Sequence, residues 1–219
     1  MPGPRPELLL LPGLGLGPEA WEPTISASAT QAAFAAVSVL PLPGYGLPAT
    51  RGTDLAPRAL AELVAARLRD RGPAVLAGHS ASCQVAAHAA TLVPDLVDGL
   101  ALVGPTTDPR ARSWPRLAAR WLATAAHERP GQVPSLARQY HRTTLATMAR
   151  AMDAARREHI EETLEAVRCP VVVLRGTNDR ICPADWAEWL APAVTLPAGA
   201  HMVPLTHGTL VAEELARSR

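Results

Sequence analysis

The chain has 219 residues, of which 48% are hydrophobic and 19% charged, a balance typical of one globular domain with a sizeable core. Its net charge of +1 creates no strong field that would favour nucleic acid or a membrane as the main partner. No segment approaches the roughly 20 apolar residues of a membrane span, and the apolar run Leu8–Leu11 is too short for a secretion signal. We therefore expect a cytoplasmic protein, with monomer and homodimer both open.

The cysteines indicate neither disulfides nor a metal site. Cys83, Cys169 and Cys182 are odd in number, and none forms a CxxC pair. The glycine-rich stretch Gly13–Gly17 has the spacing GxGxG and lacks the GxGxxG of a dinucleotide-binding loop. We expect no metal and no organic cofactor.

Short apolar runs alternate with helical segments along the chain. The predicted helices are Asp54–Asp70, whose apolar residues follow a helical period, and Ser82–Leu92. The predicted buried strands are Leu8–Leu11, Ala36–Leu40, Ala74–Ala77, Leu100–Val103, Val171–Leu174 and, more weakly, Ala193–Leu196. This alternation predicts an α/β fold with a mostly parallel sheet that has helices on both faces.

Residues 106–168 interrupt this rhythm because they contain no strand-like run. Three stretches are helix-prone, namely Trp114–Ala126, Ser135–Arg150 and Ala154–Val167. We interpret the segment as a helical lid inserted between core strands of a single domain that spans residues 1–219.

The stretch Gly78-His79-Ser80-Ala81-Ser82 follows a predicted strand and precedes a predicted helix. A serine on such a sharp turn exposes its hydroxyl, and small residues two positions before and after it let strand and helix approach closely. The alternative is that Ser80 only caps the helix. We take Ser80 as the candidate nucleophile. His79 is unsuited as its base, because adjacent side chains at a sharp turn point apart.

A serine nucleophile needs a base, and the base needs an acid that fixes its tautomer. Asp179 follows the strand Val171–Leu174, and His201 follows the last predicted strand, which gives the chain order Ser, Asp, His of this architecture. His207 is the main rival base, since the others lie in the lid or in a helix. Asp108 is the alternative acid.

Acyl transfer also requires two N–H donors for the developing oxyanion. The N–H of Ala81 is expected to supply one, and the loop after the first strand the other, with Leu14 favoured over Gly15. Gly13, Gly15 and His79 are expected to border the substrate.

Four motifs together resemble the α/β-hydrolase superfamily, in its small-lid branch of esterases, lactonases, C–C-bond hydrolases and cofactor-free haloperoxidase-like proteins. They are Leu10–Leu14 with Trp21, Leu42–Gly46, Gly78–Ser82, and Arg175–Pro183 with Gly199–His201. The resemblance implies a reduced sheet of about six strands and a Ser80–His201–Asp179 triad. The chain departs from the family pattern at Pro12, where histidine is usual, and at Ser82, where glycine is usual.

The leading hypothesis is hydrolysis of a small carboxylic ester, thioester or lactone through an acyl-serine intermediate. C–C-bond hydrolysis or a biosynthetic rearrangement on the same triad is the first alternative, and a non-catalytic small-molecule-binding protein is the second. All basic residues are arginine, and the lid carries eleven of them against seven acidic residues. Arg110 and Arg112 are therefore candidates for holding a substrate carboxylate or phosphate, although solvated or ion-paired arginines are the more ordinary reading.

Overall fold

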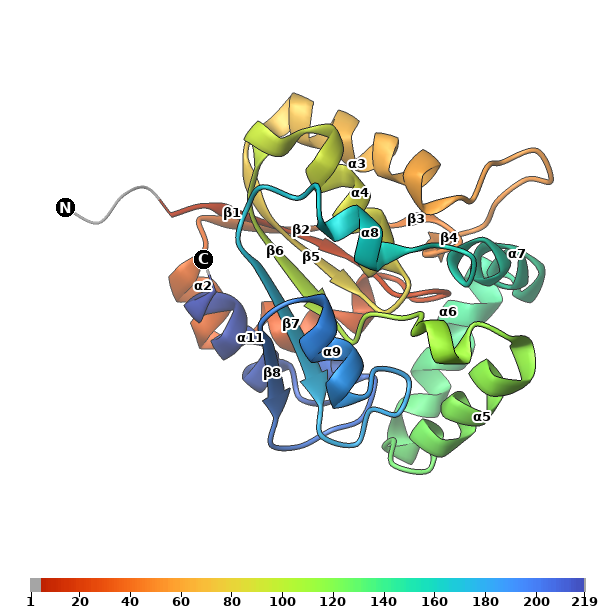
Figure 1. Ribbon diagram of the computed structural model, residues 1–219. Coiled ribbons are helices and arrows are strands. Elements are labelled where there is room, and N and C mark those ends of the chain that lie inside the picture. Colours follow the sequence, from red (N-terminus) through yellow and green to blue (C-terminus); the bar gives the residue numbers. More distant parts are fainter. Residues whose placement is uncertain (1–4, 219) are drawn as a thin grey trace.

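The computed structural model describes residues 5–218. These residues form a fully parallel six-stranded sheet with the strand order β2-β1-β5-β6-β7-β8 (Figure 1). The strands are β1 (Glu7–Leu11), β2 (Ala36–Val39), β5 (Ala74–His79), β6 (Val97–Val103), β7 (Val171–Gly176) and β8 (Ala193–Leu196). All six predicted runs are strands of this sheet, so the predicted α/β fold is confirmed. The short pair β3 (Leu42–Pro43) and β4 (Gly46–Leu47) was not predicted.

The two faces of the sheet bury alternate residues of each strand. In β1, Leu8 and Leu10 pack with α2 (Ser28–Ala33) and α11 (Gly208–Arg217). Leu9 and Leu11 belong to the opposite core with α3 (Pro57–Arg71) and α4 (Ser82–Leu92). Since strand side chains alternate in direction, the continuous run of four leucines supplies both cores and explains why the strand is apolar throughout.

Three further helices complete these layers. The helices α1 (Glu22–Ile25) and α10 (Val203–Thr206) pack on the α11 side of the sheet, and α9 (Ala184–Leu190) packs on the α4 side. No helix within residues 5–218 is long and apolar enough to cross a membrane.

The segment between β6 and β7 is helical, as predicted. It contains α5 (Trp114–Ala125), α6 (Val133–Thr143), α7 (Leu145–Ala155) and α8 (Ile160–Leu164). Figure 1 shows α5, α6 and α7, in green to teal, gathered at one end of the sheet, whereas α8 lies beside α4.

Two of the predicted lid helices are wrong in extent. The expected helix Ser135–Arg150 is divided at Thr144, whose φ of 69° breaks the helical path and whose hydroxyl accepts a hydrogen bond from the Thr147 N–H at 3.3 Å. The expected helix Ala154–Val167 is reduced to α8, because the chain turns after α7. That turn brings the Glu158 carboxylate within 2.9 Å of His88 Nε2 on α4.

Candidate active site

Ser80 lies at the sharp turn between β5 and α4. Its φ of 58° is in the left-handed region, which a non-glycine residue adopts only under constraint. The Ser80 N–H donates to Val103 O at 2.8 Å, which fixes the turn against β6. A Cβ on Gly78 would lie 2.8 Å from Ser82 O and 2.9 Å from Cys83 Cα, so only glycine fits there. The local structure is therefore the strand–turn–helix that the motif predicted.

Ser82 stands where the family pattern has glycine, and its side chain is fully buried. Its hydroxyl accepts the His79 N–H at 2.9 Å and lies 3.0 Å from Leu11 O, to which it can donate. The extra hydroxyl is thus paired inside the elbow and connects the elbow to the end of β1.

The side chains of Ser80, His201 and Asp179 form a hydrogen-bonded chain. His201 Nε2 is 2.8 Å from Ser80 Oγ, and His201 Nδ1 is 2.8 Å from Asp179 Oδ2. The second carboxylate oxygen, Oδ1, accepts the N–H groups of Ile181 at 2.9 Å and Cys182 at 3.0 Å. The three residues are at most 7% exposed. Because Nδ1 faces the Asp179 carboxylate, it carries the proton of His201, and Nε2 is the acceptor that faces the Ser80 hydroxyl.

Burial and charge act in opposite directions on this pair. Burial alone would lower the pKa of His201, but the charge and hydrogen bond of Asp179, with a smaller contribution from Glu128, raise that pKa above its usual value. Burial would raise the pKa of Asp179, but His201 and the two N–H donors lower it. Asp179 is therefore a carboxylate that stabilises the protonated form of His201.

The rival acid and base have other partners. The Asp108 carboxylate accepts hydrogen bonds from Arg110 and, at 2.7 Å, from Arg120. The His207 ring contacts the Thr206 hydroxyl at 2.9 Å. Neither side chain takes part in the hydrogen bonds that reach Ser80.

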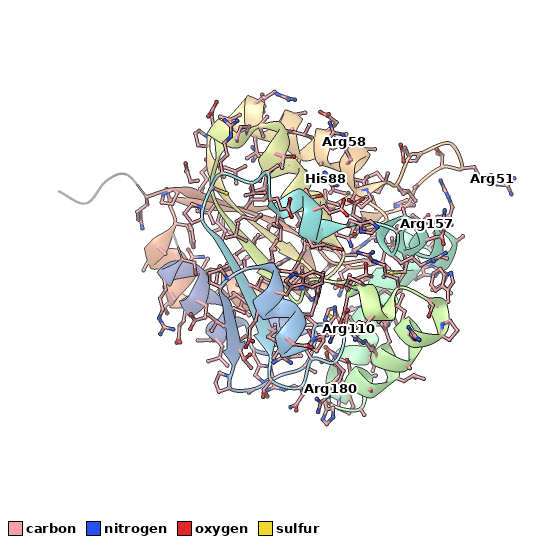
Figure 2. All side chains as sticks on the ribbon, viewed as in Figure 1. Arg51, Arg58, His88, Arg110, Arg157 and Arg180 are labelled. Atoms are coloured by element: carbon pink, nitrogen blue, oxygen red, sulfur yellow. The ribbon has the colours of Figure 1, made fainter. Side chains whose placement is uncertain are left out.

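The two candidate substrate arginines are already paired with carboxylates. Arg110 binds Asp108 and Asp185, and Figure 2 shows it beside α9. Arg112 binds Glu161 at 2.7 Å. Neither arginine lines a pocket beside Ser80.

The loop after β1 is held close to the elbow. A Cβ on Gly13 would lie 2.6 Å from His79 Nδ1, so the glycine permits this approach. The Gly15 N–H donates to Gly44 O at 2.8 Å and is not free for an oxyanion, whereas Leu14 lines the space beside Ser80. His79 also lines that space, and its Nε2 donates to His201 O at 3.0 Å. Burial, with the nearby His201, lowers the pKa of His79 to about 3, so this ring stays neutral.

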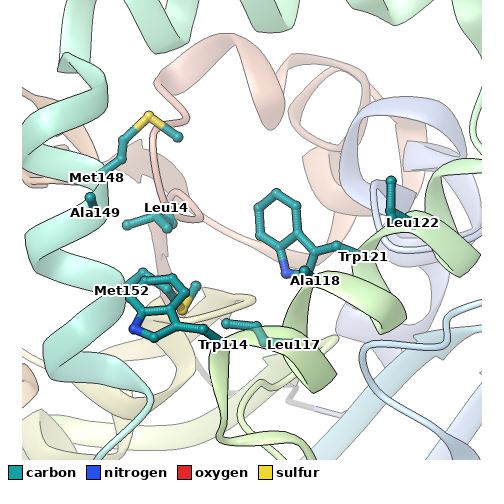
Figure 3. Close-up of a pocket in the computed structure, with 9 residues that line it drawn as sticks. All are labelled: Leu14, Trp114, Leu117, Ala118, Trp121, Leu122, Met148, Ala149 and Met152. Atoms are coloured by element: carbon teal, nitrogen blue, oxygen red, sulfur yellow. The ribbon is translucent and has the colours of Figure 1, made fainter.

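Ser80 opens into a narrow slot of 20 Å³, bordered by Leu14, His79, Trp121, Tyr140, His201 and Met202 among others. Two larger spaces adjoin it. The apolar pocket, of 390 Å³, shares Leu14 and Trp121 with the slot (Figure 3). The mixed pocket, of 370 Å³, shares Trp121, Tyr140, His201 and Met202 with the slot and also contains Glu128 and Arg129.

The lid contributes residues to the site that the sequence alone did not identify. Trp121 borders all three spaces. The Glu128 Oε1 accepts the N–H groups of His201 and Met202, both at 2.8 Å. The amphipathic pattern of α5 gave a weak signal for Trp121, but no sequence signal connects Glu128 to a loop more than 70 residues away.

Comparison with protein-family models matches residues 8–214 to the alpha/beta hydrolase family. A comparison with curated protein sequences gave no match. A hydrolase from Oleispira antarctica is similar in structure, with a TM-score of 0.80 at 15% identity over 99% of this chain and 93% of that chain. The enol-lactonase of Burkholderia xenovorans has a TM-score of 0.75 at 17% identity, over 98% of this chain and 91% of that chain. The N-formylmaleamic acid deformylase of Pseudomonas putida has a TM-score of 0.71 at 19% identity, over 96% of this chain and 92% of that chain.

The parallel sheet and the strand–serine–helix turn define an α/β hydrolase. The family match covers nearly the whole chain, and the chain belongs to the alpha/beta hydrolase family.

Proposed function

We propose that this protein is a serine hydrolase that acts on a small carboxylic ester, thioester or lactone through an acyl-Ser80 intermediate. The observation that carries the proposal is the hydrogen-bonded order Ser80–His201–Asp179, with 2.8 Å at both contacts. Membership of a hydrolase family supports a hydrolytic reaction. The presence of an enol-lactonase among the similar structures supports an ester-type bond as the target.

In this proposal, His201 Nε2 takes the proton of the Ser80 hydroxyl while Oγ attacks the carbonyl carbon. The imidazolium is stabilised by Asp179 and gives its proton to the leaving oxygen or sulfur as the carbonyl reforms. His201 then deprotonates a water molecule, which attacks the acyl-serine, and the acid is released as Ser80 regains its proton.

The oxyanion of each tetrahedral intermediate needs N–H donors. We assign this role to Ala81, directly after the nucleophile, and to Leu14. The engaged N–H of Gly15 supports Leu14 as the second donor. Such donors contribute roughly 10²–10³ to turnover in other serine hydrolases.

Labelling with a fluorophosphonate tests the nucleophile. Wild type is expected to react at Ser80, Ser80→Ala to remain unlabelled, and the control Ser82→Ala to be labelled still at Ser80, as located by mass spectrometry of the peptide. Label on Ser82 would overturn the assignment, and a wild type that resists labelling would favour the non-catalytic alternative.

A screen of activated esters, lactones and β-diketones with wild type and Ser80→Ala then separates the reactions. Turnover of esters or lactones that depends on Ser80 supports the proposal. Turnover confined to β-diketones would favour C–C-bond hydrolysis instead.

A further inference from the structure

The slot at Ser80 lies between two pockets of different character. All nine side chains that line the apolar pocket are leucine, alanine, methionine or tryptophan. Figure 3 shows Trp114, Leu117 and Trp121 of α5 across this pocket from Met148 of α7, with Leu14 between them. The mixed pocket instead contains Glu128, Arg129 and Gln132 beside its apolar residues.

The chemistry of acyl transfer distinguishes the two pockets. The attacked carbon carries the oxyanion, the leaving group and the acyl group. The leaving atom must lie within reach of His201 Nε2, which returns the proton to it. His201 and Met202 line the mixed pocket and do not line the apolar one, whereas Leu14, the assigned oxyanion donor, lines the apolar pocket and not the mixed one.

We infer that the apolar pocket between α5 and α7 binds the acyl group, that the mixed pocket binds the leaving group, and that the preferred substrate is an ester or thioester of an uncharged, apolar acid. This inference rests on the proposed function. It differs from the sequence-based hypothesis of a carboxylate held by Arg110 or Arg112, because both arginines are paired elsewhere.

The lining and the size of the apolar pocket set the substrate class. A carboxylate on the acyl group would lose its hydration there without gaining a partner, which is costly. At about 30 Å³ for each water-sized group, a volume of 390 Å³ corresponds to about 13 such groups. The rim includes Trp114, 45% exposed, and Leu122, 73% exposed, so an apolar chain can enter from solvent along them.

Two exposed alanines of α5 provide a matched pair of variants. Ala118 lines the apolar pocket, and Ala125, seven residues later on the same face of the helix, lines the mixed pocket. Neither is part of the hydrogen-bonded chain, and both are exposed, so Ala118→Trp and Ala125→Trp are expected to fold. Each tryptophan fills one pocket and leaves the other unchanged.

The two variants and wild type are assayed with two ester series. The first is 4-nitrophenyl esters from acetate to decanoate, and the second is butanoate esters of methanol, butanol and benzyl alcohol. For wild type, kcat/KM is expected to rise about threefold to fourfold per methylene up to about octanoate, the kinetic equivalent of burying each methylene. A 4-nitrophenyl ester with a terminal carboxylate on the same chain is expected to react roughly tenfold slower or worse.

Ala118→Trp is expected to remove the gain with acyl length and to keep the alcohol preference. Ala125→Trp is expected to change the alcohol preference and to leave both the acyl preference and the rate of hydrolysis of the acyl-enzyme unchanged, since the leaving group has then departed. The reverse pattern, or a faster reaction of the carboxylate-bearing ester, would overturn the inference. A failure of the proposed function itself would be distinguishable from these outcomes. Wild type would then neither turn over any ester nor react with fluorophosphonate.

Discussion

The contact between Glu128 and the loop of His201 gives the sharpest quantitative test of the site. One carboxylate oxygen of this lid residue accepts the N–H groups of both His201 and Met202 at 2.8 Å. The other oxygen accepts Gln132 Nε2 at 3.0 Å. Glu128→Ala removes the acceptor of both loop N–H groups, and Glu128→Gln keeps an acceptor oxygen while it removes the charge.

The size of the effect follows from these two bonds. A hydrogen bond to a charged group contributes about 1.5–3 kcal/mol, and the lower end applies because Glu128 is partly exposed and water can replace it. For Glu128→Ala, we expect the free energy of unfolding to fall by about 2–3 kcal/mol and Tm by about 5–10 °C. A base displaced by about 1 Å also costs up to roughly 10²-fold in kcat, with a smaller change in KM.

The charge of Glu128 provides a readout that packing alone would not move. Because this carboxylate helps to raise the pKa of His201, Glu128→Gln is expected to lower that pKa. The base is then neutral at lower pH, so the acid limb of the kcat/KM profile moves to lower pH. Profiles of kcat/KM from pH 5 to 9 and thermal unfolding curves measure both effects. Glu165→Gln, which removes an exposed charge from the same lid, serves as the control.

Three results would refute this reasoning. They are a pH profile of Glu128→Gln that coincides with those of wild type and Glu165→Gln, a wild-type Tm for Glu128→Ala, and an unchanged kcat for Glu128→Ala.

The remaining predictions concern the elbow and the charged pair. Asp179→Asn is expected to lower kcat by about 10⁴ with the fold intact, whereas Asp108→Asn leaves the pH profile unchanged; the opposite result would make Asp108 the acid. In wild type, kcat/KM should rise with pH as His201 becomes neutral, with a midpoint above the reference value of about 6.5 because the pKa of His201 is raised, and a flat profile between pH 5 and 8 would contradict general-base catalysis. Gly78→Ala should abolish activity and lower Tm, whereas Gly131→Ala, with open space around its Cα, should do neither; a stable and active Gly78→Ala would show that the turn has room for a Cβ.

The strands of the sheet and the turn at Ser80 could be predicted because each depends on a short run of neighbouring residues. A run such as Leu8–Leu11 is apolar throughout because both of its faces are buried, and this pattern survives without knowledge of its neighbours. Gly78 and Ser80 are likewise dictated by one turn of backbone. The order of serine, acid and base then follows from the ends of parallel strands, which meet at one edge of the sheet.

The lid was predicted less well because its details depend on contacts with distant residues. Nothing in Thr143-Thr144 marks a helix break, since the signals that usually end a helix are glycine and proline. The break is supported by tertiary contacts, because the Thr143 hydroxyl donates to Gly15 O at 3.1 Å. The ion pair between Arg110 and Asp185 could not be predicted either, because Asp185 lies 75 residues along the chain.

The lid has a second role besides covering the pockets, because its polar side chains bind the backbone of the loop after β1 and of the loops that carry Asp179 and His201. Gln139 Oε1 accepts the Gly17 N–H at 2.8 Å in the loop after β1. The Thr124 hydroxyl accepts the N–H of Arg180, next to Asp179, at 3.0 Å. Glu128 binds the His201 loop.

These contacts couple the choice of substrate to the precision of catalysis. Within residues 106–168, apolar side chains of α5 and α7 line the apolar pocket, and polar side chains of the same segment accept hydrogen bonds from the three loops. A substitution that enlarges the pocket by tilting α5 would also move Thr124, and with it the loop that carries Asp179. Substitutions at positions such as Ala118, which line the pocket but bind no loop, are therefore expected to change specificity with the least loss of turnover.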